Sequence, residues 1–189
     1  NILHKVKYFN EQTYGGIVSS RKPFGIESNF SKFVLSESKT HNIKLYKVGG
    51  VGFIEEKDVV SKKELIDKIK VIVSKASPGD DTYPHKIISE PIIALPKSVC
   101  TETYLVIDIL ENENQAKNLI KYMKTNFFRF MMSLVKNTQN ITKGVFVFVP
   151  KLNMDEEWTD EKLYKKYKLK QDEIDFIATI VKKMDSSDE

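Results

Sequence analysis

Hydrophobic residues recur at steps of three and four along residues 117–134, which predicts an amphipathic helix with one face against a core. A cluster of polar amides then predicts a turn at residues 137–140. The continuous apolar run of residues 145–149 predicts an inner strand after that turn. The apolar stripe of the expected helix consists of Leu119, Met123, Phe127, Phe130, Met131 and Leu134.

Shorter apolar runs elsewhere predict strands, and late periodic segments predict further helices. Two strands are expected to flank the glycine break Gly49–Gly52 within residues 43–55, and others are expected at residues 17–19, 70–74, 91–96 and 103–110. The last is expected to be central, because its apolar run is nearly continuous. Helices are expected at residues 61–67, capped by Ser61, after a Thr159 cap, and along a stripe from Ile174 to Met184. Because strands come first and helices cluster late, we expect an α+β fold built on a mixed, twisted β-sheet.

Composition indicates a folded globular chain. Of its 189 residues, 41% are hydrophobic and 30% are charged. We expect one main domain at residues 1–154 and a helical extension at residues 155–189 that packs on it. Acidic residues outnumber basic ones in this extension, so positive charge is concentrated in the rest of the chain.

The charge around the long expected helix is one-sided, although the net charge of the chain is only +4. No acidic residue occurs between Glu113 and Asp155. This pattern has two interpretations, a solvated lysine face on a core helix or a surface that faces a polyanion. The cations of the stretch, all expected away from the apolar stripe, are Lys117, Lys121, Lys124, Arg129, Lys136, Lys143 and Lys151.

The sequence contains no apolar run of the roughly 20 residues that a membrane-spanning helix needs, and no secretory leader. We therefore expect a soluble, cytoplasmic protein with no membrane partner. Cys100 is the single cysteine, and the three histidines are scattered, which argues against a disulfide and against a zinc site. Because the chain opens with Asn1 rather than methionine, we expect a fragment of a longer polypeptide.

Motifs for catalysis are almost absent. The sequence lacks a nucleophile elbow, a Walker loop and a cofactor-binding glycine fingerprint, and the glycines at 49–52 are followed by no helix pattern. The triplets at 37–39 and 55–57 have the Glu-x-Lys form of Mg²⁺-dependent nucleases, but such triplets are common at this Glu and Lys content. Cys100 has no histidine near it in sequence and is expected to be a small buried residue rather than a nucleophile.

Six stretches of the sequence together resemble one family. They resemble, in this order, the C-terminal target recognition domain of bacterial single-chain restriction-modification enzymes that carry an adenine amino methyltransferase. The stretches are KPFG at 22–25, KVGGVGFI at 47–54, KVIVSKASPG at 70–79, SVCTETYLVI at 98–107, KTNFFRFMMSLVKNTQNITKGVFVFVP at 124–150 and WTDEKLYKKYKLKQDEIDFI at 158–177.

This resemblance implies a type II enzyme whose DNA-reading module is the present chain. Its partners would be double-stranded DNA and the catalytic methyltransferase and nuclease domains of the same polypeptide, which are absent from this fragment. S-adenosylmethionine and Mg²⁺ are implied for that parent enzyme, and neither a cofactor nor a catalytic or metal-binding residue is expected in this chain.

In such a module some side chains would read bases and others would hold phosphates. Guanidinium groups suit guanine and amides suit adenine, so Arg21, Gln139 and Asn140 are the expected base readers. We expect the lysines to contact phosphates. The full set of predicted DNA-binding residues is Arg21, Lys22, Gly50, Lys75, Lys121, Lys124, Thr138, Gln139, Asn140, Thr142 and Lys143.

Two other classes of function stay open at this point. A protein-interaction domain could use the basic surface to bind an acidic partner, including the acidic tail of its own chain. A stand-alone Mg²⁺-dependent nuclease could use a Glu-x-Lys triplet. Within the DNA-binding class, a related possibility is half of a type I specificity subunit. Such subunits join their recognition units by long heptad-patterned helices, and no such heptads occur here.

Overall fold

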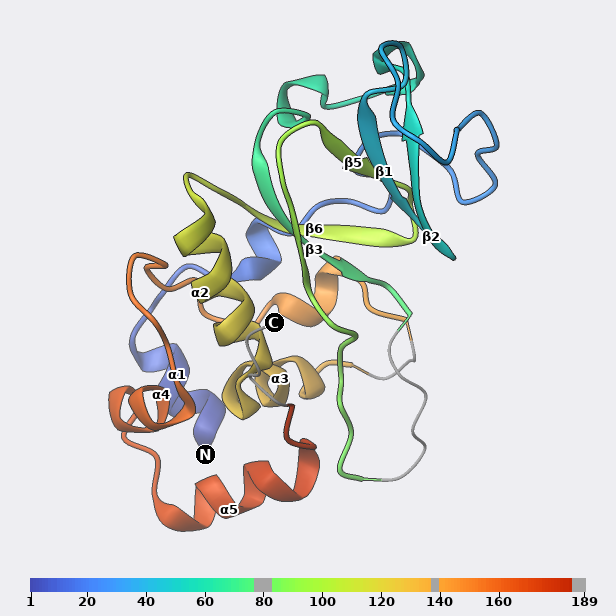
Figure 1. Ribbon diagram of the computed structural model, residues 1–189. Coiled ribbons are helices and arrows are strands. Elements are labelled where there is room, and N and C mark those ends of the chain that lie inside the picture. Colours follow the sequence, from blue (N-terminus) through green and yellow to red (C-terminus); the bar gives the residue numbers. More distant parts are fainter. Residues whose placement is uncertain (77–82, 137–139, 185–189) are drawn as a thin grey trace.

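The computed structural model describes residues 1–76, 83–136 and 140–184. Its strands gather at one end and its helices at the other (Figure 1). One three-stranded sheet has the order β2-β1-β5 and the other has the order β4-β3-β6. The strands are β1 (Ile43–Lys47), β2 (Gly50–Ile54), β3 (Ile69–Ser74), β4 (Ile92–Ala94), β5 (Ser98–Cys100) and β6 (Tyr104–Leu110).

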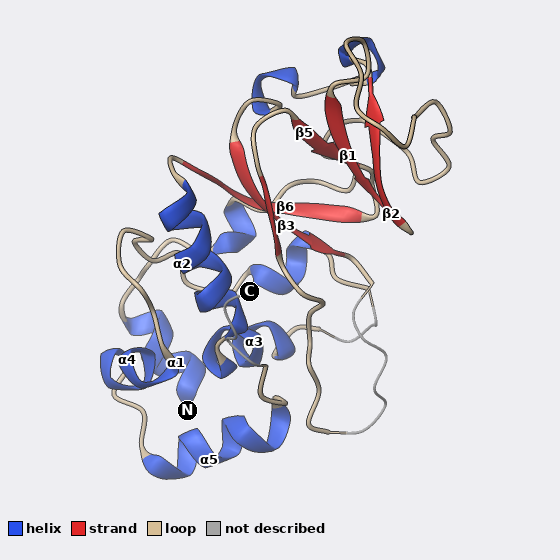
Figure 2. Ribbon diagram, in the orientation of Figure 1, coloured by secondary structure: helices blue, strands red, loops and turns tan. Residues whose placement is uncertain are grey.

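Five α-helices are present among the described residues (Figure 2). The end of the molecule that they form is called the helical lobe below, and the end that contains the β2-β1-β5 sheet is called the β-lobe. The expected α+β fold is therefore confirmed. The helices are α1 (Ile2–Tyr8), α2 (Glu113–Lys124), α3 (Asn126–Ser133), α4 (Asp160–Lys166) and α5 (Gln171–Ile180), and short 3-10 turns occur at Tyr14–Gly16, Glu56–Asp58, Lys63–Leu65 and Lys143–Phe146.

The predicted hairpin is present, because β1 and β2 pair antiparallel across the glycine break. The expected mixed sheet is present, but the described strands form two sheets, and the expectation that residues 103–110 are a central strand is wrong. Only the β2-β1-β5 sheet is mixed, since β1 pairs parallel with β5. In the other sheet β3 is the central strand and β6 lies beside it.

The β4-β3-β6 sheet separates two hydrophobic cores. Val71 and Val73 of β3 belong to the core of the helical lobe, whereas Ile72 between them belongs to the core of the β-lobe. Successive side chains of a strand point to opposite faces, so each face of this sheet is buried. This burial explains why β3 and β6 are nearly continuous in their apolar character, although both pairings of β3 are antiparallel.

The expected helix over residues 117–134 is divided by Thr125. The backbone of Thr125 is extended, with ψ of 149°, and its hydroxyl oxygen accepts a hydrogen bond from Phe128 N at 3.1 Å, which caps α3. The carboxylate of Asp160 accepts bonds from Asn126 N and Phe127 N and completes this cap. The apolar residues continue across the break because α2 and α3 pack in the same core, in which six consecutive residues of α3, Phe127 to Met132, are buried.

The expected strand at 145–149 is wrong. Lys143–Phe146 forms a 3-10 helix, and Val149 ends the following turn by accepting a hydrogen bond from Tyr14 N at 2.9 Å. Val145, Phe146 and Val149 are buried, so the apolar run reflects burial in the helical core and not strand pairing. A short apolar run does not by itself distinguish these two cases.

Other local expectations also differ from the structure. Residues 17–19 form no strand, and the turn at Lys63–Leu65 begins after Lys62 without a cap from Ser61. The helix α1 is not among the predicted elements. The expectation that Leu134 lies on the core stripe is wrong, because this side chain is exposed. The Thr159 cap is confirmed by its bond from Lys162 N at 3.3 Å.

Arg129 was expected on a solvated face, but its side chain is fully buried. Its guanidinium donates hydrogen bonds to the backbone oxygens of Lys124, Thr125, Lys86 and Lys182. These bonds join the break between α2 and α3 to two segments that are distant in sequence. Burial lowers the pKa of Arg129 to about 10, so the group stays charged at neutral pH.

The C-terminal extension contributes to the core of the helical lobe. Leu163, Tyr167, Ile177 and Val181 belong to the same buried cluster as the side chains of α2 and α3. The extension and the main domain therefore share one core. The boundary after residue 154 stays a prediction.

Phe127→Ala should lower the free energy of unfolding by about 3 to 5 kcal/mol, because a buried aromatic ring is replaced by a cavity. The Phe127 ring is fully buried and stacks on Tyr167, with centroids 4.9 Å apart and planes 3° apart. Phe176→Ala is the matched control, since that ring is 54% exposed. Urea denaturation measures both variants, and equal losses would contradict the assignment of Phe127 to the core.

Arg129→Met should lower the free energy of unfolding by at least about 2 kcal/mol. Methionine cannot donate to the buried carbonyl oxygens, and each buried acceptor left without a hydrogen bond costs about 1 to 3 kcal/mol. Lys117→Met on exposed α2 surface should change it by less than about 0.5 kcal/mol. The measurement is thermal and urea unfolding of both variants. An Arg129→Met protein as stable as the unaltered chain would show that the carbonyl contacts contribute nothing.

Stability should also depend on pH through Glu173, whose bonds from Lys5 Nζ at 2.5 Å and Lys170 N at 2.9 Å lower its pKa to about 2. In the unfolded chain this pKa is about 4.3, so on acidification the unfolded state takes up the proton first. The stabilisation is complete above about pH 4.3 and is lost as the pH falls toward 2. The melting temperature of Glu173→Gln should therefore fall less between these limits than that of the unaltered chain, and parallel curves would contradict the assignment.

Candidate functional site

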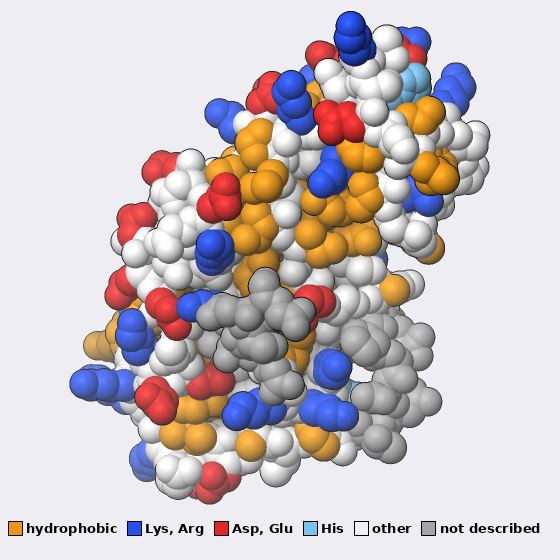
Figure 3. Space-filling view, in the orientation of Figure 1, with side chains coloured by type: hydrophobic (Ala, Val, Ile, Leu, Met, Phe, Trp, Pro, Cys, Tyr) orange, Lys and Arg blue, Asp and Glu red, His pale blue; other side chains and the backbone are white. Residues whose placement is uncertain are grey.

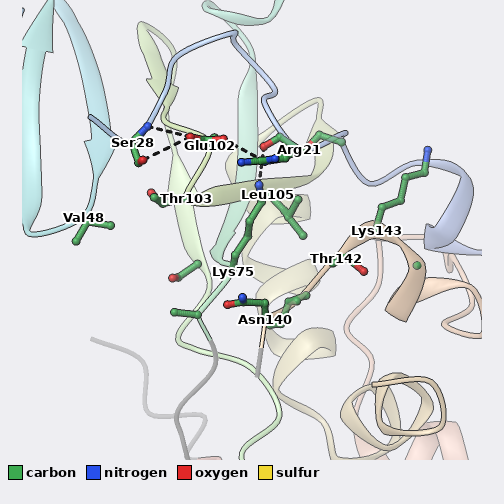
Figure 4. A pocket seen from close by; sticks show the side chains of 15 residues that line it. Arg21, Ser28, Val48, Lys75, Glu102, Thr103, Leu105, Asn140, Thr142 and Lys143 are labelled. Carbon is green, nitrogen blue, oxygen red and sulfur yellow. Dashed lines mark hydrogen bonds and ion pairs between the residues drawn. The ribbon is translucent and has the colours of Figure 1, made fainter. Parts of the chain in front are cut away.

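A cavity of about 660 Å³ opens beside the end of β3, where the two lobes meet (Figure 4). Its walls come from five parts of the chain: residues 19–28, the β1–β2 turn, the end of β3 at residues 74–76, the β5–β6 turn with the start of β6, and residues 140–144. The lining residues used below are Arg21, Ser28, Lys75, Glu102, Asn140, Thr142 and Lys143.

Residues 20–28, called the Arg21 loop below, form one wall of the cavity. The loop starts from Ser19, which is tied to β6 by a hydrogen bond from Ser19 N to Val106 O and another from Val106 N to Ser19 Oγ, both 2.9 Å. Within the loop Gly25 has φ of +73°, and a Cβ atom there would lie 2.7 Å from the Val60 Cβ. Only glycine therefore fits at this position of the loop.

Glu102, in the β5–β6 turn, holds the Arg21 loop at two points. Its Oε1 accepts hydrogen bonds from Ser28 N at 3.3 Å and Ser28 Oγ at 3.4 Å. Its Oε2 lies 3.2 Å from Arg21 Nε and forms an ion pair. The backbone bond from Ser28, with Arg21, Lys22 and Lys75 nearby, lowers the pKa of Glu102, so this carboxylate is ionised at neutral pH.

Lys75 connects three walls of the cavity. Its Nζ donates to Arg21 O at 2.5 Å, its backbone N donates to Thr103 O at 2.9 Å, and its backbone O accepts from Ile141 N at 2.8 Å. Partial burial lowers the pKa of Lys75. The neighbouring Ala76 forms a β-bridge with Asn140, so the 140–144 segment is aligned on the end of β3.

The cavity brings together five of the predicted DNA-binding residues. Lys143 is exposed, and its side chain has no hydrogen-bond or ion-pair partner among the described residues. Of the turn expected at residues 137–140, only Asn140 lies within the described residues. Asn140 forms a β-bridge with Ala76, and a 3-10 helix follows at Lys143–Phe146. The five residues are Arg21, Lys75, Asn140, Thr142 and Lys143.

Other predicted residues lie elsewhere. Lys121 and Lys124 of α2 form ion pairs with Glu157 and Glu90, so this stripe is neutralised in part by acidic residues of the same chain. Lys22 pairs with Glu27. Gly50 begins β2 and is exposed, and Val48 of the same turn, not Gly50, lines the cavity. Thr138 and Gln139 lie outside the described residues.

Two residues of the site were not predicted from sequence, namely Glu102 and Ser28. The available signal was weak: Glu102 is the sole acidic residue between Glu90 and Asp108, and it stands between two threonines. Its partners lie 74 residues or more away along the chain, as the Ser28 contacts illustrate. Pairing over that distance leaves no periodic pattern in the sequence.

Charges of both signs alternate over the face of the molecule seen in Figure 3, around a band of hydrophobic side chains that runs down from the β-lobe. That face therefore offers no broad surface of one charge. The concentration of cations that matters for a polyanion is local, because Arg21, Lys75 and Lys143 share one cavity with the single carboxylate of Glu102 among its described lining residues.

The alternative catalytic residues have ordinary structural partners. Cys100 is fully buried, as expected, and burial raises the pKa of its thiol to about 12, so it stays protonated at neutral pH. Glu55 pairs with Lys57 at 2.9 Å and lies 3.8 Å from His41. Within residues 1–76, 83–136 and 140–184, no three His, Cys, Asp or Glu side chains form a cluster that could hold a metal ion.

No helix in the described part of the chain has the length and apolar character needed to cross a membrane. The sequence matches no protein-family model, and no curated protein shows significant similarity to it.

Proposed function

We propose that this chain is the sequence-specific DNA-recognition module of a restriction-modification enzyme, which positions a target site for adenine methylation and cleavage by catalytic domains outside the chain. The observation that supports this proposal most is the cavity at the end of β3. It gathers an arginine, two lysines, an asparagine and a threonine from segments far apart in sequence.

These side chains suit both parts of a DNA contact. Lys75 and Lys143 can neutralise phosphates, and Thr142 can donate a hydrogen bond to a phosphate oxygen. The amide of Asn140 can bind adenine through N6 and N7, and the guanidinium of Arg21 can bind guanine through O6 and N7. The cavity therefore combines positioning groups with groups that distinguish bases.

The attachment of these residues also suits recognition. They lie on loops that are fixed to strand ends by the backbone bonds of Lys75 and Ser19. Binding residues are often carried by loops on a rigid scaffold, because the loop exposes the side chain while the scaffold limits the entropy lost on binding. S-adenosylmethionine and Mg²⁺ belong, in this proposal, to the catalytic domains, and no residue of this chain is assigned to them.

The ion pairs of the α2 lysines favour DNA over an acidic protein as the partner of this chain. Lys121 pairs with Glu157 of the extension, and Lys5 pairs with Glu173 there, so acidic groups of the same chain already neutralise part of the basic surface. An acidic protein partner would have to replace these contacts. Lys143 has no carboxylate partner among the described residues, so a DNA phosphate can reach it without that exchange. Lys75 forms no ion pair in the described structure, although the Glu102 carboxylate lies near it.

Binding of a duplex of about 30 base pairs to the chain should weaken with salt, with a slope of log K against log[salt] of about −1 to −3, because one to three cavity cations displace counterions. Lys143→Ala should reduce this slope by about 0.9. Lys117→Ala on α2 is the matched control and should leave it unchanged. Fluorescence anisotropy over a salt series measures all three proteins.

Binding that is absent at low salt, or that does not change with salt, would contradict the electrostatic part of the proposal. Polyglutamate of equal total charge serves as a competitor in the same assay. If it displaces DNA as well as unlabelled duplex does, the surface is one for acidic proteins and the DNA proposal is wrong.

A further inference from the structure

The arginine of the Arg21 loop is held by its inner nitrogen and leaves its outer nitrogens accessible. Arg21 Nε pairs with Glu102 Oε2 at 3.2 Å, and the side chain of Arg21 is 81% exposed. Among the described residues, neither Nη1 nor Nη2 donates a hydrogen bond. The two outer nitrogens can therefore act as a two-donor fork at the cavity, where Arg21 lies next to Glu102 (Figure 4).

The backbone of Arg21 and the Glu102 carboxylate, which together hold this fork, are each fixed by further hydrogen bonds. The carbonyl of Arg21 accepts from Lys75 Nζ at 2.5 Å, and Glu102 also binds Ser28 at the other end of the loop. Glu102 N donates to Ile26 O at 2.8 Å, so backbone and side chain of Glu102 both hold the loop. The buried Glu102 Oε2 has no hydrogen-bond partner in the described structure, and Arg21 is the cation beside it.

We propose that Glu102 is a positioning residue that orients Arg21 as a two-donor fork for one guanine of the recognised DNA site. This inference rests on the proposed function. It gives a role to the Glu102 carboxylate, whose negative charge is otherwise unfavourable on a DNA-binding surface. Guanine presents two acceptors, N7 and O6, at the spacing of Nη1 and Nη2 in the major groove. Holding the guanidinium plane before binding reduces the side-chain entropy lost in that contact.

The carboxylate also favours a base over a phosphate as the ligand of Arg21. A phosphate carries a full negative charge and is repelled by ionised Glu102, which lies next to the guanidinium. A guanine edge carries only partial charges, so it loses less from the neighbouring carboxylate. The fork is thus suited to reading, while Lys143, which has no carboxylate partner among the described residues, is suited to phosphate.

The test is selection of bound sequences from a randomised duplex pool by the 189-residue chain and its variants. Arg21→Ala should lose the preference for guanine at one position by about ten-fold or more, and Arg21→Lys should lose it as well, because lysine lacks the fork. Glu102→Gln should weaken the preference at the same position by about three-fold or more, since a neutral amide holds the guanidinium less firmly. Its affinity for random duplex should rise, because a negative charge has been removed.

Glu27→Gln is the matched control, because Glu27 is an acidic residue of the same loop that pairs with Lys22 and not with Arg21. It should raise the affinity for random duplex without changing the preference at the guanine position. Arg21→Ala alters an exposed side chain, so it tests the fork even if Glu102→Gln is less stable.

The outcomes separate the two proposals. If the unaltered chain binds DNA but prefers no guanine, or if Glu102→Gln leaves the preference intact, the positioning role is wrong and DNA binding stands. A Glu102→Gln protein whose binding falls equally on all sequences assigns Glu102 to general loop support and also overturns the role. If the unaltered chain binds no DNA at low salt, the proposed function fails, and this inference fails with it.

Discussion

The helical lobe depends on one buried charge. Arg129 lies inside the lobe, and its guanidinium donates hydrogen bonds to backbone oxygens and to the side-chain oxygen of Asn126. A buried guanidinium is costly unless its donors are satisfied. That requirement fixes the break between α2 and α3 against the segment at Lys86 and against Lys182 after α5. Three regions distant in sequence are thereby held together by one side chain.

The β-lobe is joined to this helical lobe through β3 and β6, and the candidate site lies at the junction. Lys75 follows β3 directly and bonds to the Arg21 loop, to the β5–β6 turn and to Ile141. The position of the site is therefore a consequence of sheet topology. Cations that would repel one another in isolation are kept at fixed places by backbone bonds, and the Glu102 carboxylate offsets part of their repulsion.

Sequence reasoning predicted the α+β class and the hairpin at β1 and β2, because alternation and glycine breaks are local signals. It also placed Phe127 and Phe130 correctly in the core. The sequence-based predictions are wrong where an apolar pattern marks burial but does not determine the secondary structure. Thr125 separates two helices although the apolar period continues across it, and residues 145–149 include buried side chains but do not form a strand.

For the site, sequence identified Arg21, Lys75 and Asn140 by residue type but did not predict their partners. The contact of Glu102 with the Arg21 loop exists only after the chain has folded. In the same way, Arg129 was assigned to a solvated face because its charge is visible in the sequence, whereas the carbonyls that compensate it are not. Tertiary pairing, rather than local preference, decides these positions.

The alternation of β3 between two cores has a further consequence for how the protein could change over time. Val71 and Val73 pack on the helices, and Ile72 packs on the β-lobe, so neither core can be redesigned without constraint from the other. The two lobes should therefore melt as one cooperative unit and not in sequence. Exposed side chains of the junction loops, such as Arg21 and Lys143, belong to neither core, so they can be exchanged while the shared strand stays unchanged.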